Sequence, residues 1–93
     1  MSKILTIWKY LLQVAETQVV EMPKGSEIIS AMAIGEDNFI WARVDAAELE
    51  KEIKEIRVIG TNHSIQECEK LRHIGTTTMM DNKLIWHIFE VLK

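Results

Sequence analysis

The chain has 93 residues, 47% hydrophobic and 27% charged, which suits one globular domain over residues 1–93 and argues against disorder. A net charge of −3 excludes a general DNA or long-RNA binder, because phosphate neutralisation needs a basic surface, but leaves a small anionic ligand open. With Cys68 as its one cysteine, no signal-peptide pattern and no run long enough to span a membrane, the sequence indicates a cytoplasmic protein without a membrane partner.

The first half of the chain alternates β-rich runs with turn formers. Residues 4–12 are rich in β-branched and aromatic side chains, and Thr6, Trp8 and Tyr10 share one face of the expected strand. The opposite face is apolar except for Lys9. Further strands are expected over 17–22, 27–34 and 39–44, with proline- and glycine-containing turns at 22–26 and 35–38.

The second half is less uniform. Residues 45–54 combine good helix formers with exposed charges and are ambiguous. Strands are expected over 55–59, 73–79 and 84–91, with Gly75 as a candidate bulge, and residues 65–72 are compatible with a short helical turn. Six to seven strands with at most one or two helical turns predict a mainly β fold, a small antiparallel β-sandwich or barrel-like domain.

A polar loop is the first candidate binding element, and it comprises Gly60, Thr61, Asn62 and His63. Glycine allows close backbone approach to a ligand, and successive N–H groups with hydroxyl and amide side chains can surround a phosphate. The alternative is an ordinary polar connection whose side chains make turns. The loop lacks the Gly-Lys-Ser/Thr ending of a P-loop.

The aromatic residues allow two interpretations. Trp8 and Tyr10 lie on the more polar face of their strand, where they could stack on nucleobases or fill a core. Trp41 and Trp86 lie in the middle of expected strands, a position more typical of core residues.

Charged and nucleophilic residues favour binding over catalysis. Arg43 and Arg57 present guanidinium forks suited to phosphate, although a paired or exposed strand charge is the simpler interpretation. The three histidines lack metal-ligand spacing, and Cys68 is flanked by glutamates, which oppose thiolate formation. We therefore expect no catalytic residue, no metal, no cofactor and no enzyme activity.

Six separated motifs occur in order: Trp8-Lys9-Tyr10, Met22-Pro23-Lys24-Gly25, Trp41-Ala42-Arg43-Val44-Asp45, Gly60-Thr61-Asn62-His63, Ile74-Gly75-Thr76 and His87-Ile88-Phe89-Glu90. In this order of motifs the sequence resembles a family of small proteins that share an uncharacterised domain and are common in phages and prophages. The sequence departs from the family pattern at Asn62, where glycine is usual, at Ser64, where proline is usual, and at Ser26, where alanine is usual.

The resemblance implies a phage-encoded β domain in the cytoplasm of the infected bacterial host. The sequence is also similar to viral sponge proteins (anti-CBASS proteins), which counter anti-phage defence. Those proteins are homo-oligomers that sequester a cyclic dinucleotide such as 3′3′-cyclic GMP-AMP without cleaving it. On this hypothesis the protein is a homo-oligomer, with a tetramer favoured. The ligand would contact Trp8, Tyr10, Arg43, Arg57, Gly60, Thr61, Asn62, His63 and Thr76.

A different class of function stays open beside this one. The chain could be a protein–protein interaction module, either an inhibitor of a host enzyme or an accessory virion protein. Trp8, Tyr10 and Trp41 would then be interface anchors, because large aromatics dominate binding energy at such surfaces.

Overall fold

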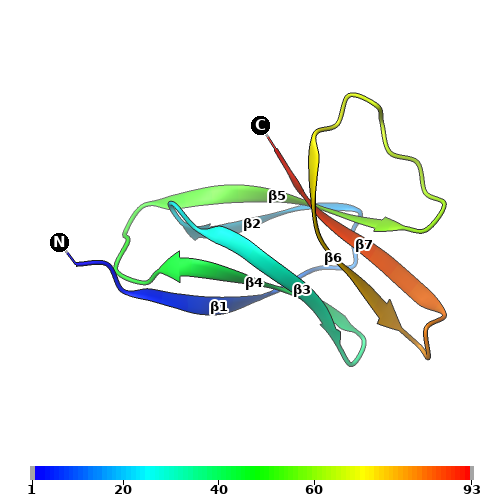
Figure 1. Cartoon of the computed structure of the whole chain (residues 1–93), viewed down its shortest axis with the longest axis horizontal. Coiled ribbons are helices and arrows are strands. Elements are labelled where there is room, and N and C mark those ends of the chain that lie inside the picture. Colours follow the sequence, from blue (N-terminus) through cyan, green and yellow to red (C-terminus); the bar gives the residue numbers. More distant parts are fainter. Residues whose placement is uncertain (1, 93) are drawn as a thin grey trace.

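The computed structural model describes residues 2–92, which form seven β-strands and no α-helix. Hydrogen bonds join them into a three-stranded sheet of order β1-β4-β3 and a four-stranded sheet of order β2-β5-β7-β6, antiparallel throughout (Figure 1). The mainly β fold is therefore confirmed. The strands are β1 (Leu5–Leu11), β2 (Thr17–Pro23), β3 (Glu27–Ile34), β4 (Asp37–Asp45), β5 (Lys51–Gly60), β6 (Leu71–Met79) and β7 (Leu84–Val91).

Within residues 2–92 there is no helix with the length and apolar character needed to cross a membrane.

The core lies between the two sheets and follows the alternation of each strand. On β4 the side chains of Ile40, Ala42 and Val44 are buried, whereas the intervening Phe39, Trp41 and Arg43 point outward, so the predicted alternation is confirmed. The core position favoured for Trp41 is wrong, because the second sheet covers the other face of β4. Buried residues of β2, β3, β5 and β7 complete the cluster. These are Met22, Ile28, Ile56, Val58 and Ile88.

Glycine sets the tight β3–β4 hairpin. Only Gly35 and Glu36 separate the two strands, and Gly35 has a φ of 63°. A positive φ at the first central position is the mark of a type II′ turn, whose twist matches that of the flanking strands. The predicted hairpin connection is confirmed, and β4 begins two residues earlier than expected.

Gly75 lets the two sheets approach each other closely where β6 passes β3. The pairing of β6 with β7 shifts register between His73 and Gly75, which confirms the predicted bulge. A Cβ at Gly75 would lie 3.3 Å from both the Cβ and the carbonyl oxygen of Ala31 on β3. A larger side chain would therefore separate the strands at this crossing.

Two regions with helix-forming sequences are not helical. Residues 51–54 belong to β5, where they pair with β2, and the ambiguous stretch before them is a turn. There Asp45 accepts hydrogen bonds from the backbone N–H groups of Ile4 (2.9 Å) and Ala47 (3.0 Å), which lower the pKa of its carboxyl.

The helical turn proposed for residues 65–72 is wrong. Leu71 and Arg72 pair with β7. Hydrogen bonds between neighbouring strands pair the backbone N–H and C=O groups of more residues than a single helical turn could. The residues before them form an irregular loop that stands away from the sheets (Figure 1).

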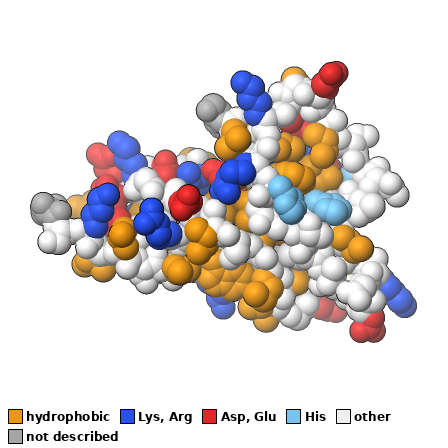
Figure 2. Space-filling view, in the orientation of Figure 1, with side chains coloured by type: hydrophobic (Ala, Val, Ile, Leu, Met, Phe, Trp, Pro, Cys, Tyr) orange, Lys and Arg blue, Asp and Glu red, His pale blue; other side chains and the backbone are white. Residues whose placement is uncertain are grey.

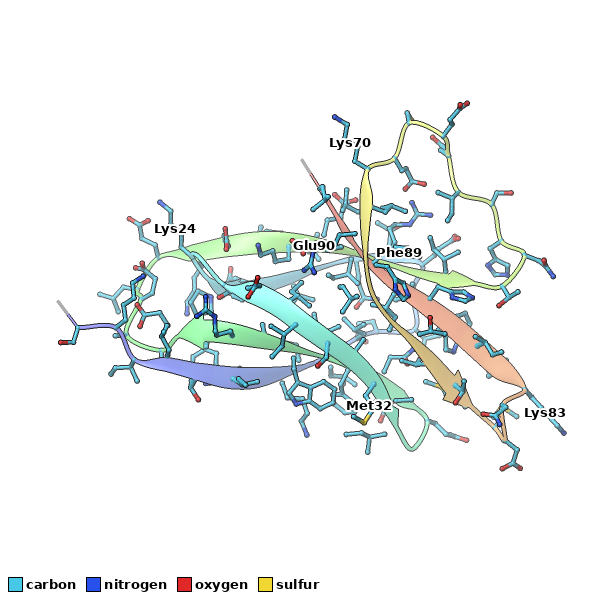
Figure 3. The ribbon with its side chains drawn as sticks, in the orientation of Figure 1. Lys24, Met32, Lys70, Lys83, Phe89 and Glu90 are labelled. Carbon is cyan, nitrogen blue, oxygen red and sulfur yellow. The ribbon has the colours of Figure 1, made fainter. Side chains whose placement is uncertain are left out.

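Three charged side chains meet on the core side of the four-stranded sheet. Glu90 on β7 is only 8% exposed, and its carboxylate lies 2.7 Å from Nη2 of Arg72 and 3.5 Å from Nζ of Lys54 (Figure 3). Arg72 also donates a hydrogen bond to the carbonyl of Ile28 on β3, at 3.0 Å. The cluster thus connects the two sheets and keeps Glu90 paired.

Candidate functional site

A polar pocket lies on the outer face of the four-stranded sheet, beneath the loop between β5 and β6. We call it the Arg57 pocket. Arg57 projects from β5, and the loop supplies five more polar or charged side chains. The pocket is lined by Glu16, Arg57, Asn62, His63, Ser64, Gln66 and Glu69.

The charge of Arg57 is largely matched by carboxylates. One guanidinium nitrogen, Nη1, contacts Glu69, and Nη2 lies 3.9 Å from Glu16. The Nε of Arg57 is buried and has no hydrogen-bond partner among residues 2–92. An anionic ligand would therefore have to displace or neutralise a carboxylate before it could bind this guanidinium closely.

The backbone at Asn62 keeps the shape that glycine would give. Its φ is 74°, in the left-handed region that glycine adopts freely and that asparagine tolerates better than most residues. Asparagine at this position is therefore compatible with the turn. His63 folds back over Gly60, since its ring atoms lie 3.2–3.4 Å from the position of a Cβ at Gly60. Any side chain at Gly60 would displace this ring.

Histidines and threonines form a hydrogen-bonded chain beside the pocket. Nε2 of His87 lies 2.9 Å from the hydroxyl of Thr61, and Nδ1 lies 3.4 Å from that of Thr76. Thr76 also lies 3.1 Å from Nε2 of His73, whose ring packs edge-on against Phe89 at 5.2 Å. These hydrogen bonds hold the side chains of Thr61 and Thr76 in place relative to each other. Among residues 2–92, no group of three His, Cys, Asp or Glu side chains has a metal-binding arrangement.

The remaining predicted site residues lie on the three-stranded sheet. Trp8 and Tyr10 pair with Ala42 and Ile40, whose side chains are buried, so this face of β1 looks inward. Tyr10 packs against the core, and Trp8 is 39% exposed on the edge strand. Arg43 points to the outer side of β4, 4.0 Å from Glu27.

The outer side of the three-stranded sheet is apolar and open. We call it the apolar face. Its side chains on β1 and β3 are 49–56% exposed, and its two aromatic rings on β4 lie 6.1 Å apart. Lys9 lies over one ring, 4.9 Å from the centroid of Phe39. Hydrophobic side chains gather over the middle of the molecule where β1, β3 and β4 lie (Figure 2). The apolar face comprises Leu5, Ile7, Leu11, Met32, Ile34, Phe39 and Trp41.

A protein-family model described as Domain of unknown function (DUF7352) matches residues 4–93. The chain belongs to this family. Comparisons with curated proteins and with solved structures gave no significant match.

In this DUF7352 chain the predicted site is divided between two sheets. Arg57, Thr61, Asn62 and His63 come together, and Thr76 joins them through His87. Trp8, Tyr10 and Arg43 lie on the other sheet.

Sequence reasoning missed the acidic partners of Arg57 and the apolar face as a surface. Glu16 and Glu69 are distant from Arg57 in sequence, and no local pattern links them to it. The signal for the apolar face was present, since Leu5, Ile7 and Leu11 alternate on β1. The alternation puts these three side chains on one face without deciding whether that face is covered, and all three are exposed.

Tyr10 gives a test of its placement. Its hydroxyl is buried without a partner among residues 2–92, so Tyr10→Phe should raise the free energy of unfolding at neutral pH by about 1 kcal/mol. Burial raises the pKa of this hydroxyl above that of a free tyrosine. The unfolded chain then loses its proton first, and wild-type stability falls as the pH rises through about 10.

The measurement is urea unfolding followed by circular dichroism at pH 7 and at about pH 10.5. The advantage of Tyr10→Phe should grow at the higher pH, because phenylalanine cannot ionise. An advantage that is absent at pH 7 and unchanged in alkali would show that the hydroxyl is solvated.

Proposed function

We propose that the protein acts by surface contact rather than turnover, as an interaction module that assembles with a second copy of itself through the apolar face. The observation that carries this is the exposure of Leu5, Ile7, Leu11, Met32 and Ile34, each about half exposed. Soluble monomers rarely present a contiguous apolar patch of this kind, whereas protein interfaces do.

The free edge of β1 favours a second copy as the occupant. Within residues 2–92, β1 pairs with β4 on one side and with no strand on the other. Two-fold packing of the apolar face against the apolar face of a second copy would bury the same exposed side chains of both chains, Met32 included, with the open β1 edges at the rim of the interface.

Charge also favours this geometry. The chain carries a net charge of −3, so two copies repel each other over most approaches. On the outer side of the three-stranded sheet, Arg43 is matched by Glu27, and Lys9 adds a positive charge. Approach through the apolar face therefore avoids the bulk of the carboxylates.

Light scattering coupled to size-exclusion chromatography tests the proposal. A chain of 10.8 kDa should show a mass of at least about twice that value at high micromolar concentration, falling toward the monomer on dilution. A mass of one chain at every concentration would overturn it.

The second candidate is the sequestration of an anionic nucleotide, with a cyclic dinucleotide such as 3′3′-cyclic GMP-AMP bound intact as an antagonist of anti-phage defence. Its support is the gathering of Arg57, Asn62 and His63 at one pocket, with Thr61 next to them in the loop. The carboxylates of Glu16 and Glu69 oppose it, and this ranks it second.

Calorimetry with 3′3′-cyclic GMP-AMP tests this candidate. Tight binding that is lost in Arg57→Gln, with intact nucleotide recovered after denaturation, would support sequestration. Absence of heat with cyclic dinucleotides would reject it, and recovery of a cleaved nucleotide would indicate an enzyme instead.

A further inference from the structure

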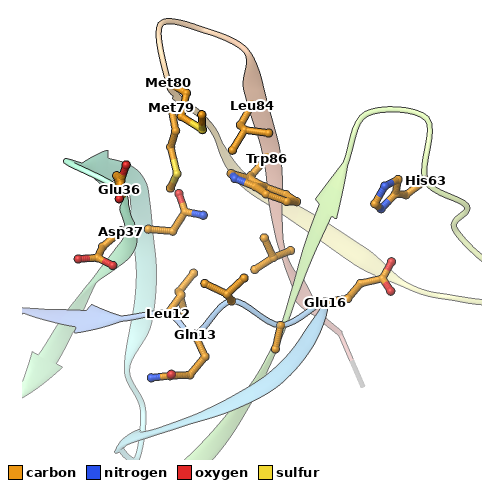
Figure 4. Close-up of a pocket in the computed structure, with 14 residues that line it drawn as sticks. Leu12, Gln13, Glu16, Glu36, Asp37, His63, Met79, Met80, Leu84 and Trp86 are labelled. Carbon is orange, nitrogen blue, oxygen red and sulfur yellow. The ribbon is translucent and has the colours of Figure 1, made fainter.

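An apolar cavity of about 430 Å³ opens at the end of the molecule where the β1–β2 connection meets the β3–β4 and β6–β7 hairpins (Figure 4). Trp86 and Leu84 of β7 form one wall, and Met79 and Met80 lie beside them. Leu12 lies on the opposite side. The volume lies within the range of roughly 300–1,000 Å³ that is typical of small-molecule sites.

The charged side chains lining this cavity are carboxylates. Glu36 and Asp37 lie together at the tip of the β3–β4 hairpin, and Glu16 lies across the cavity from them (Figure 4). No lysine or arginine is among the lining residues. Within residues 2–92 neither Glu36 nor Asp37 forms an ion pair, and Glu16 has only the distant guanidinium of Arg57, at 3.9 Å.

We propose that this cavity binds a small organic cation with an apolar body, of the arylalkylamine class. The apolar walls take the hydrocarbon part, the indole of Trp86 offers a face to the ammonium group, and Glu36 and Asp37 supply negative charge at the rim. The same carboxylates repel phosphates and carboxylates, so this site selects ligands of the opposite charge to those considered for the Arg57 pocket.

The β6–β7 hairpin adds a second observation at the same place. Met80, Asp81 and Asn82 have φ values of 52°, 55° and 69°. Asp81 and Asn82 are the central pair of a turn closed by a hydrogen bond from the N–H of Lys83 to the carbonyl of Met80 (3.1 Å), and positive φ is the favoured geometry of a type I′ hairpin turn for both residue types. Met80 is the unusual left-handed residue of the three, and the turn places it against the cavity.

The test uses 2-phenylethylamine as the probe, with 2-phenylethanol as its neutral analogue and 3-phenylpropionate as its anionic analogue. Binding is followed by the NMR signal of the Trp86 indole N–H, which a Trp86→Phe variant assigns among the three tryptophans. The amine should give saturable shifts of this signal and bind at least about tenfold more tightly than either analogue.

Variants separate the rim charge from the net charge. The double variant Glu36→Gln/Asp37→Asn should weaken amine binding several-fold. The matched double variant Glu48→Gln/Glu50→Gln removes two carboxylates that do not line the cavity and should leave binding unchanged. All four positions lie in turns or at strand ends, so both proteins should fold.

The proposal is overturned if the three probes bind equally, if shifts spare Trp86, if saturable binding is absent, or if the two double variants behave alike. None of these outcomes depends on self-association or on nucleotide binding, so this test fails or succeeds separately from those in the preceding section.

Discussion

Glu90→Ala should lower the free energy of unfolding by about 2–3 kcal/mol. Breaking a buried ion pair by removing one partner leaves the other charge uncompensated, at a cost of roughly 3–5 kcal/mol when both partners are fully buried. Glu90 is almost fully buried and contacts both Lys54 and Arg72. The expected cost lies below that range because Arg72 is partly exposed and can turn toward water.

Chemical denaturation measures this loss, with Glu21→Ala as the matched control. Glu21 is also a glutamate on a strand, but it is exposed, and its replacement should change stability by less than about 0.5 kcal/mol. The pair Lys54→Met/Glu90→Met should be more stable than Glu90→Ala, since apolar side chains of similar volume can replace a buried ion pair. Equal stability of Glu90→Ala and Glu21→Ala would mean that water already screens the cluster.

Met32→Lys should weaken self-association by about tenfold to a hundredfold while leaving the fold intact. Met32 is 56% exposed on β3 and lies opposite Phe39 of β4, the central strand of the apolar face (Figure 3). A charge there stays hydrated in the monomer but must be desolvated in the interface, where the few dominant side chains contribute about 2 kcal/mol each.

The control is Ile53→Lys, which adds the same charge at an equally exposed strand position on the other sheet. Ile53 is 65% exposed on β5 and lies opposite Glu21. Light scattering should show that Met32→Lys alone shifts the mass toward the monomer, with both variants unfolding at similar denaturant concentrations. Equal association of the two variants would place the interface away from the apolar face.

Much of the turn and bulge geometry could be predicted from a few neighbouring residues. Gly35 requires a turn with positive φ, and Gly75 in a strand-like run suggests a bulge; both occur where the sequence places them. Asn62 has the left-handed backbone that its residue type tolerates in a turn. These features depend on a few neighbouring residues, which a sequence shows directly.

The candidate site was less predictable because it depends on pairing between distant segments. Arg43 and Arg57 look equivalent in sequence, each lying on a strand among apolar neighbours. The first belongs to the three-stranded sheet and the second to the four-stranded sheet, and within one chain they contribute to different surfaces. The glutamates that match Arg57 come from the β1–β2 connection and from the β5–β6 loop.

By itself the sequence determined most of each strand, although not the first residues of β5 and β6, and the division of each strand into two faces, because side chains alternate strictly along extended backbone. It separated Trp8 and Tyr10 from Leu5, Ile7 and Leu11 correctly. Only the tertiary structure decided which face is covered. The second sheet packs on the side of Tyr10 and leaves the more apolar side open, since coverage depends on where distant strands pair and not on the hydrophobicity of one strand.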